Sequence, residues 1–293
     1  MDRIIGGSRF VRDVKPYAHD LRVYDLGAGQ VEALAVPRYG WTEVGMSDQA
    51  RDDLAMCQAG FMWRDGGWVP YVAPLDQDRS LLNRERATRR ARTKVRRLAK
   101  FKRLTTLLTL TYRENMLDRA RMQHDFDNFM KRVRRVCPDF EYICVFERQK
   151  RGAWHAHIAT RRILPVLAVG GQLVKSYDLL RSAWRGVVGQ ENGNVDVSRR
   201  KRLSRSPAKL ASYLAKYIGK TFDQAERYVN SYSASGRSIP EAVLVRIDDG
   251  DQGLAISALW ELLGIELSGE VDVHHALMSA GGYFLSISPA PGT

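Results

Sequence analysis

The stretch YICVFERQKRGAWHAHIAT, residues 142–160, decides how the rest of this chain can be arranged. It starts with an apolar, β-rich run, passes through a polar turn at residues 148–152, and continues in a second short run that carries His155 and His157. Two strand-like runs on either side of a polar turn are typical of a β-hairpin. We therefore expect a hairpin here, in the middle of the fold.

The register of this hairpin predicts a possible metal site. If the turn is centred near Arg151, Glu147 lies opposite His155, and strand alternation puts His157 on the same face as His155. Two imidazoles and a carboxylate with open positions suit Mg²⁺ or Mn²⁺ better than a closed zinc site. A His-x-His pattern alone is a weak signal, and two ordinary half-buried or surface histidines are the alternative interpretation.

Charge is distributed unevenly along the 293 residues, of which 44% are hydrophobic, enough for a sizeable core. The formal net charge of +13 indicates a polyanionic partner. By segment, the net charge is −4 in residues 1–78, +11 in 79–103, +13 in 104–220 and −7 in 221–293. We take these four segments as an N-terminal β-rich accessory region, a basic helix, the core and an acidic C-terminal region.

Cysteine content and hydropathy indicate the compartment. The three cysteines, Cys57, Cys137 and Cys144, have no paired spacing, which favours a reducing environment over a disulfide framework. No apolar run approaches the roughly 18 residues of a membrane span, and the N-terminus lacks the apolar block of a signal peptide. We expect a cytoplasmic protein without membrane association.

The elements before the core are a β-rich region and a basic helix. Residues 1–78 predict short strands, including a hairpin over residues 61–72 with a turn at 65–67. Residues 80–101 show helical spacing of apolar positions, with arginines over the remaining surface. Residues 79–103 contain 12 cations against Glu85, which favours phosphate contact over a merely solvated helix face.

The core pattern predicts an α+β fold. A strand over residues 104–112 is followed by a helix over 116–136, the hairpin, a second helix over 176–188 and a strand over 194–197. The order β, α, β, β, α, β is that of a ferredoxin-like, split βαβ antiparallel sheet with helices packed on one face.

A second informative stretch is SPAKLASYLAKYIGK, residues 206–220, which predicts a helix that ends at Gly219. Tyr213 and Tyr217 are four residues apart, so both phenols project from one side. Each is followed three residues later by a lysine, Lys216 and Lys220. Core-edge packing is the usual role of such tyrosines, but their repetition in a basic segment favours catalysis. The preceding loop adds candidate DNA-binding cations, which with Arg151 of the turn are Arg199, Arg200, Lys201, Arg202 and Arg205.

Three blocks, LLTLTY (107–112), ERQKRGAWHAH (147–157) and YLAKYIGK (213–220), resemble in this order the motifs of the HUH endonuclease superfamily. The doubled tyrosine is most similar to the two-tyrosine rolling-circle replication initiators of single-stranded DNA phages and plasmids. The resemblance covers residues 104–220. Ala156, between the histidines, is smaller than the bulky apolar residue usual there.

The resemblance implies a mechanism. His155 and His157 would bind Mg²⁺ or Mn²⁺, with Glu147 as third ligand and Gln149 as a competitor for that role. Tyr213 and Tyr217 would be nucleophiles that form a 5′-phosphotyrosine link and leave a free 3′-OH. The implied partners are single-stranded DNA at a replication origin and a helicase and polymerase in the cytoplasm of a bacterial host.

Two alternatives remain open. An HUH-type transposase or conjugative relaxase would use the same chemistry on another substrate. A ferredoxin-like sheet with a basic surface would also suit a non-catalytic nucleic-acid-binding protein, although the aromatic code of the RNA-recognition module is absent.

Overall fold

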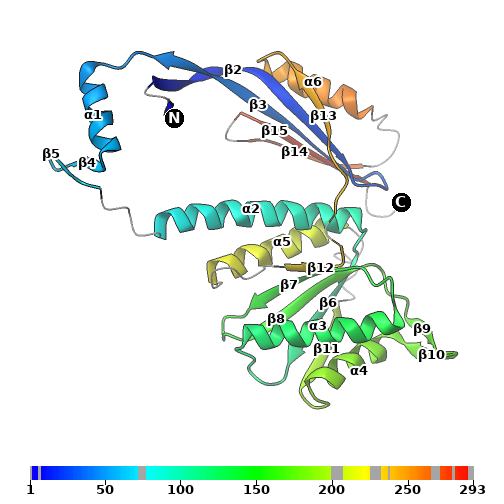
Figure 1. Cartoon of the computed structure of the whole chain (residues 1–293). Helices are drawn as coiled ribbons and strands as arrows, with labels where there is room; N and C mark the ends of the chain where they lie inside the picture. Colours follow the sequence, from blue (N-terminus) through cyan, green and yellow to red (C-terminus); the bar gives the residue numbers. More distant parts are fainter. Residues whose placement is uncertain are drawn as a thin grey trace. The chain divides into compact units, whose positions relative to one another are not determined.

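The computed structural model describes residues 2–5, 8–71, 77–198, 207–224, 232–236, 238–264, 271–278 and 281–289; the side chains of residues 2, 77–82, 198 and 219–224 lie outside this description. The described chain is a mixed α+β structure with antiparallel sheets and six helices (Figure 1). It divides into two compact units, residues 1–25, 31–82 and 241–287, and residues 26–30, 83–240 and 288–293. None of the described helices is both long and apolar enough to span a membrane.

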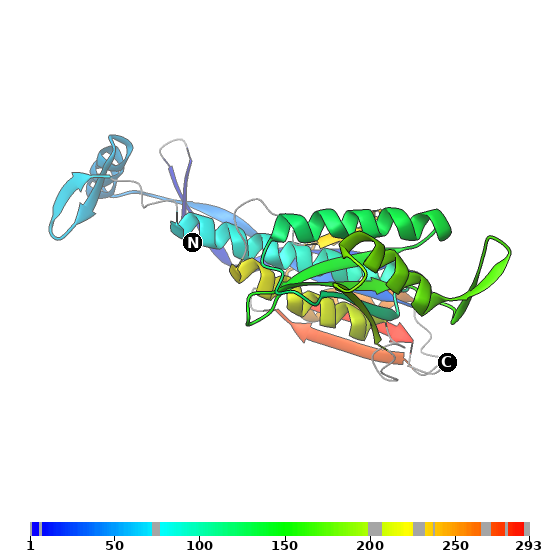
Figure 2. The ribbon, with the colours of Figure 1, turned by 90° about the horizontal axis from the view of Figure 1, so that it is seen from below.

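The second unit is built on a five-stranded antiparallel sheet in the order β11-β6-β8-β7-β12. These strands are β6 (Thr106–Tyr112), β7 (Tyr142–Arg148), β8 (Trp154–Thr160), β11 (Gly193–Ser198) and β12 (Tyr232–Ala234). Helix α3 (Arg119–Val136) connects β6 to β7, and α4 (Ser176–Val188) precedes β11. An additional hairpin of β9 (Val166–Val169) and β10 (Gln172–Lys175) extends away from this sheet (Figure 2).

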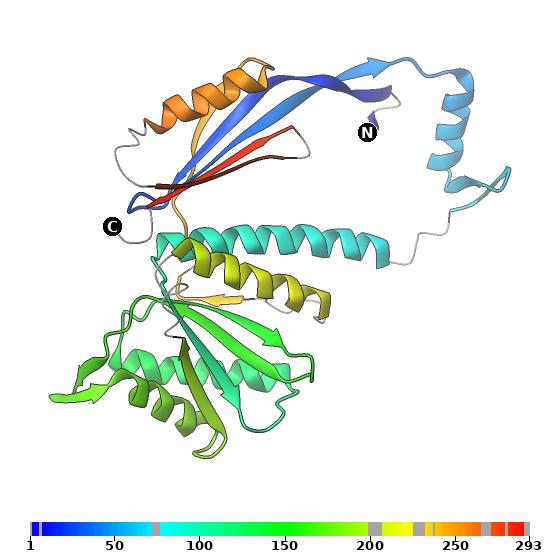
Figure 3. The ribbon, with the colours of Figure 1, turned by 180° about the vertical axis from the view of Figure 1, so that it is seen from behind.

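Helices cover both faces of this sheet, so the expectation of helices on one face is wrong (Figure 3). Phe126 of α3 and Trp184 of α4 belong to the core on one face. On the other face, Leu214 of α5 (Pro207–Gln224) and Leu98 of α2 (Gln77–Phe101) share a core with Val145. The physical reason lies in β7, where residues 142–146 are all buried. A strand that is apolar on both sides needs cover on both sides.

Local sequence signals explain where these helices begin, and in one case mislead about the end. The carboxylate of Asp118 accepts hydrogen bonds from the backbone N–H groups of Ala120 and Arg121, which caps α3. The α4 bounds agree with the expected helix. Helix α5 continues to Gln224 instead of ending at Gly219. A single interior glycine costs a helix only about 1 kcal/mol and does not have to end it.

The first unit has a six-stranded antiparallel sheet in the order β1-β2-β3-β15-β14, with β13 paired to β2. Its strands are β1 (Asp2–Ile5), β2 (Ser8–Asp25), β3 (Val31–Val44), β13 (Val243–Ile247), β14 (Val271–Leu277) and β15 (Tyr283–Pro289). Helix α6 (Gln252–Leu263) packs Ala255 and Leu259 on one face. Helix α1 (Asp48–Gln58) and the expected hairpin, β4 (Phe61–Arg64) with β5 (Gly67–Pro70), complete the unit.

This sheet changes two expectations for the ends of the chain. Residues 1–78 and 221–293 were treated as separate regions, yet β15 pairs with β3 and β13 pairs with β2. The strands were expected to be short, whereas β2 has 18 residues and β3 has 14. Neither end of the chain carries enough apolar residues for a core of its own, and pairing lets them share one.

Candidate active site

The central hairpin has the predicted register. Glu147 on β7 lies opposite His155 on β8, and His157 lies opposite Val145. Because side chains alternate along a strand, the two histidines and Glu147 share the face of Val145. That face carries the core to which α5 contributes. The hairpin therefore presents its polar groups toward the helix that carries the two tyrosines.

His157 is held at both ring nitrogens. Its Nε2 lies 2.8 Å from Glu147 Oε2, and its Nδ1 lies 3.2 Å from the hydroxyl of Thr109 on the neighbouring strand β6. The side chains of His157 and Glu147 are only 8% and 13% exposed. These contacts fix the plane of the imidazole and keep the carboxylate close to it.

His155 is held by the turn of the hairpin. The amide nitrogen of Gln149 donates to His155 Nδ1 at 3.1 Å, and Arg151 Nε donates to the Gln149 carbonyl oxygen at 3.1 Å. Burial, followed by the nearby His157 and Arg151, lowers the pKa of His155 to about 4, against the opposing effect of Glu147. The imidazole is therefore neutral at physiological pH, as a metal ligand must be.

The two tyrosines of α5 lie against His157. The ring of Tyr217 stacks on the imidazole with 4.5 Å between centroids and 23° between planes, while Tyr213 meets it edge-on at 6.3 Å. The Tyr217 hydroxyl donates to the Tyr213 hydroxyl at 2.6 Å. Burial and this hydrogen bond raise the pKa of Tyr217 above its usual value. Both phenols, His157 and Glu147 thus form one cluster.

The donor set of this cluster fits a divalent metal in its residue types. In the part of the chain that the structure describes, no three His, Cys, Asp or Glu side chains form a group that could hold a metal ion. His157 Nε2 and Glu147 Oε2 converge, and their chemistry suits Mg²⁺ or Mn²⁺. His155 lies on the same face, but its Nδ1 is engaged by Gln149. Only the orientation of His155 separates these residues from a three-ligand site.

The candidate DNA-binding cations differ in how far they can be located. Arg151 and Lys216 are exposed. The side chain of Lys220 is outside the description, and so are the loop cations Arg199, Arg200, Lys201, Arg202 and Arg205. On the basic helix α2, the exposed cations are Arg86, Arg89, Arg90 and Arg92. Arg97 and Lys100 are buried, although the helix pattern assigned arginines to the solvent-facing surface.

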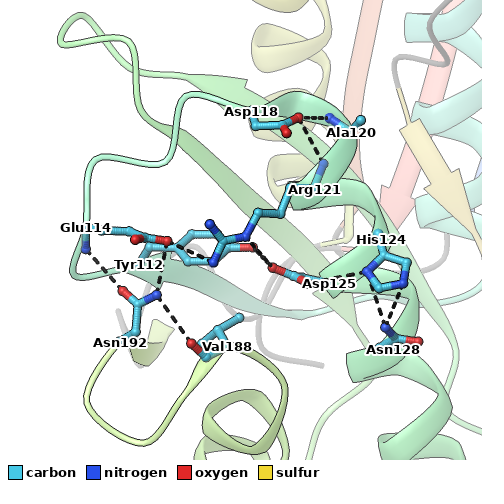
Figure 4. Close-up of polar contacts among 10 residues, drawn as sticks. All are labelled: Tyr112, Glu114, Asp118, Ala120, Arg121, His124, Asp125, Asn128, Val188 and Asn192. Carbon is cyan, nitrogen blue, oxygen red and sulfur yellow. Dashed lines mark hydrogen bonds and ion pairs between the residues drawn. The ribbon is translucent and has the colours of Figure 1, made fainter.

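A polar network next to the core was not anticipated from the sequence (Figure 4). Tyr112, the last residue of β6, donates 2.7 Å from its hydroxyl to the buried carboxylate of Asp125 on α3. Arg121 reaches Glu114, and Asn192 Nδ2 donates to the same carboxylate. Thr109 was also missed, although its position inside the block LLTLTY was a usable signal. The network joins β6, α3 and the turn before β11.

Comparison with known proteins gives one match. Residues 105–222 match a family model of replication-associated proteins, that of the replication-associated protein ORF2. This segment contains Glu147, both histidines and both tyrosines of the cluster. The match indicates a role in replication initiation and is consistent with a rolling-circle initiator and, in general terms, with nickase activity. No curated protein and no solved structure matches the chain.

Proposed function

We propose that this protein initiates rolling-circle replication by nicking single-stranded origin DNA with a tyrosine nucleophile. The observation that carries the proposal is the contact of Tyr217 and Tyr213 with His157, which is itself paired with Glu147. A phenol adjacent to neutral imidazole and carboxylate groups is suited to transesterification at a phosphodiester. We further propose that residues 104–220 form a ferredoxin-like HUH core, which the strand order β11-β6-β8-β7 supports.

Each residue of the cluster has a role in this scheme. His155, His157 and Glu147 would hold Mg²⁺ or Mn²⁺, which when bound neutralises charge on a phosphate oxygen. The oxygen of one tyrosine attacks phosphorus, an oxygen–phosphorus bond forms, and the bond from phosphorus to the 3′ oxygen breaks. The phenolic proton is lost and the 3′ oxygen gains one, which leaves a 5′-phosphotyrosine and a 3′-OH. A host polymerase would extend that 3′-OH behind a host helicase.

Positive charge near the cluster would hold the strand. Arg151 on the hairpin turn and Lys216 on α5 are exposed and flank the residues that would react. The exposed arginines of α2 belong to the helix that shares a core with α5. Cations in these positions would bind phosphates on either side of the cleaved bond.

The test is formation of a covalent adduct. We expect that labelled single-stranded DNA incubated with the protein and Mn²⁺ gives a protein–DNA species that survives denaturing electrophoresis. The double variant Tyr213→Phe/Tyr217→Phe should form none, while Tyr177→Phe on α4 should react as the wild type does. Absence of an adduct with every divalent metal and every origin strand would favour a non-catalytic nucleic-acid-binding protein. Adduct formation only on transposon-end or transfer-origin DNA would favour a transposase or relaxase.

A further inference from the structure

A chain of two hydrogen bonds leads from the hairpin turn to His155. Exposed Arg151 donates from Nε to Gln149 Oε1 at 3.1 Å, and Gln149 donates from Nε2 to His155 Nδ1 at 3.1 Å. The His155 side chain at the end of the chain is buried. Thus a surface cation contacts one ring of the candidate active site through a single amide.

The order of donors along this chain fixes where His155 carries its proton. A guanidinium group can only donate, so the carbonyl oxygen of Gln149 must face Arg151. The amide NH₂ then faces His155, and because NH₂ can only donate, Nδ1 must accept. A neutral imidazole with an accepting Nδ1 carries its hydrogen on Nε2.

This tautomer is unsuited to metal binding. The lone pair of Nδ1 is taken by Gln149, and Nε2 has a hydrogen where a metal needs a lone pair. His157 differs because its Nδ1 meets the hydroxyl of Thr109, which can donate or accept. His157 can therefore adopt either tautomer, whereas His155 follows the amide of Gln149.

We propose that Arg151 and Gln149 are positioning residues that hold His155 in the Nε2–H tautomer, and that a phosphate of the DNA strand releases it by drawing Arg151 away. Without Arg151, the Gln149 amide can rotate so that its oxygen accepts from Nδ1–H, which leaves the Nε2 lone pair available. One proton leaves Nε2 and one is gained at Nδ1 through solvent, so the ring stays neutral. This inference rests on the proposed function, and it makes metal affinity depend on bound DNA.

The tautomer can be observed directly in metal-free, DNA-free protein by ¹⁵N NMR of the imidazole nitrogens. We expect His155 as the Nε2–H tautomer in the wild type and as Nδ1–H in Gln149→Glu, whose carboxylate can only accept. Lys150→Gln is the matched control, since it changes the net charge equally at the adjacent exposed position. An Nδ1–H wild type, or a Gln149→Glu spectrum identical to that of Lys150→Gln, would overturn the proposal.

The release step has two further readouts. Arg151→Ala should bind Mn²⁺ about tenfold more tightly than Lys150→Ala, which removes the same charge without touching Gln149. A saturating single-stranded oligodeoxynucleotide, added without metal, should move wild-type His155 to the Nδ1–H tautomer. Equal Mn²⁺ affinities or an unchanged spectrum would refute release by phosphate. Because none of these measurements requires nicking, failure of the proposed function would leave them interpretable.

Discussion

Tyr217 donates a hydrogen bond of 2.6 Å to the hydroxyl of Tyr213, so the two phenols meet beside the imidazole of His157. Their Cα atoms are one helical turn apart, roughly 6 Å along the axis, yet their hydroxyls are adjacent. A small movement of the helix or the DNA could therefore present either oxygen to the same phosphate. Two nucleophiles suit a reaction in which one holds the 5′ end while the other cuts again.

The first prediction concerns these tyrosines. Tyr213→Phe and Tyr217→Phe should each retain nicking of an origin oligonucleotide, and the double variant should retain none. Tyr217→Phe should be the faster single variant at neutral pH, because burial raises the pKa of the phenol that remains in Tyr213→Phe. Single-turnover rates of the variants test this. Complete loss of nicking in one single variant, with circle release intact in the other, would assign the neighbour to packing.

The second prediction concerns the histidines. His155→Ala/His157→Ala should nick at background level while single-stranded DNA affinity falls little, because binding depends on distributed cations. Rates and filter-binding affinities should be compared with His124→Ala, whose side chain is 75% exposed on α3. Glu147→Gln should weaken metal dependence less severely. Undiminished cutting by the double variant would exclude the proposed metal site.

Short-range features of the candidate site were predictable. The centre of a tight turn fixes every cross-strand pair, so Arg151 as centre already gave Glu147 opposite His155. Four-residue spacing likewise put Tyr213 and Tyr217 on one side of a helix. The role of Thr109 was not accessible in this way, because it depends on β6 being the neighbour of β8.

Long-range pairing explains what the sequence did not reveal. Tyr283 pairs with Ala35, and Val243 pairs with Val23, across more than 200 residues in each case. No local pattern encodes such partners, because each strand looks the same whichever edge it joins. Helices on both faces of the core sheet were missed for a related reason, since the burial of both sides of β7 appears only once α5 is in place.

The third prediction concerns salt. Replacing the exposed arginines of α2, Arg86, Arg89, Arg90 and Arg92, with glutamine should flatten the dependence of DNA affinity on salt. The slope should fall by roughly 0.7 for each phosphate of single-stranded DNA that the variant no longer binds. Affinities measured across a series of salt concentrations give the slope. The matched control is Arg51→Gln/Arg64→Gln, which also removes exposed cations. An unchanged slope in the α2 variant would mean that this helix face is only solvated.

The fourth prediction concerns the network of Figure 4. Tyr112→Phe leaves the buried carboxylate of Asp125 without its 2.7 Å donor, which should cost about 1–3 kcal/mol of unfolding free energy. Denaturant unfolding of Tyr112→Phe, Asp125→Asn and the double variant gives the coupling between the two groups. Tyr177→Phe should be nearly neutral. Additive effects in the double variant would show that the two groups are energetically independent.

The last prediction concerns pH and stability. The pKa of His155 is about 4 in the folded chain and about 6.5 when unfolded, because burial and nearby cations oppose protonation. Between these values the unfolded state binds a proton that the folded state does not, so the free energy of unfolding falls as pH drops from 6.5 to 4. The loss should be on the order of 3 kcal/mol in metal-free protein. Denaturant unfolding at pH 7 and pH 4.5 measures it. His155→Gln should lose much of this pH dependence, whereas His124→Gln, at an exposed position, should keep it. If both variants retain the wild-type slope, the imidazole of His155 is not the group that makes the fold sensitive to acid.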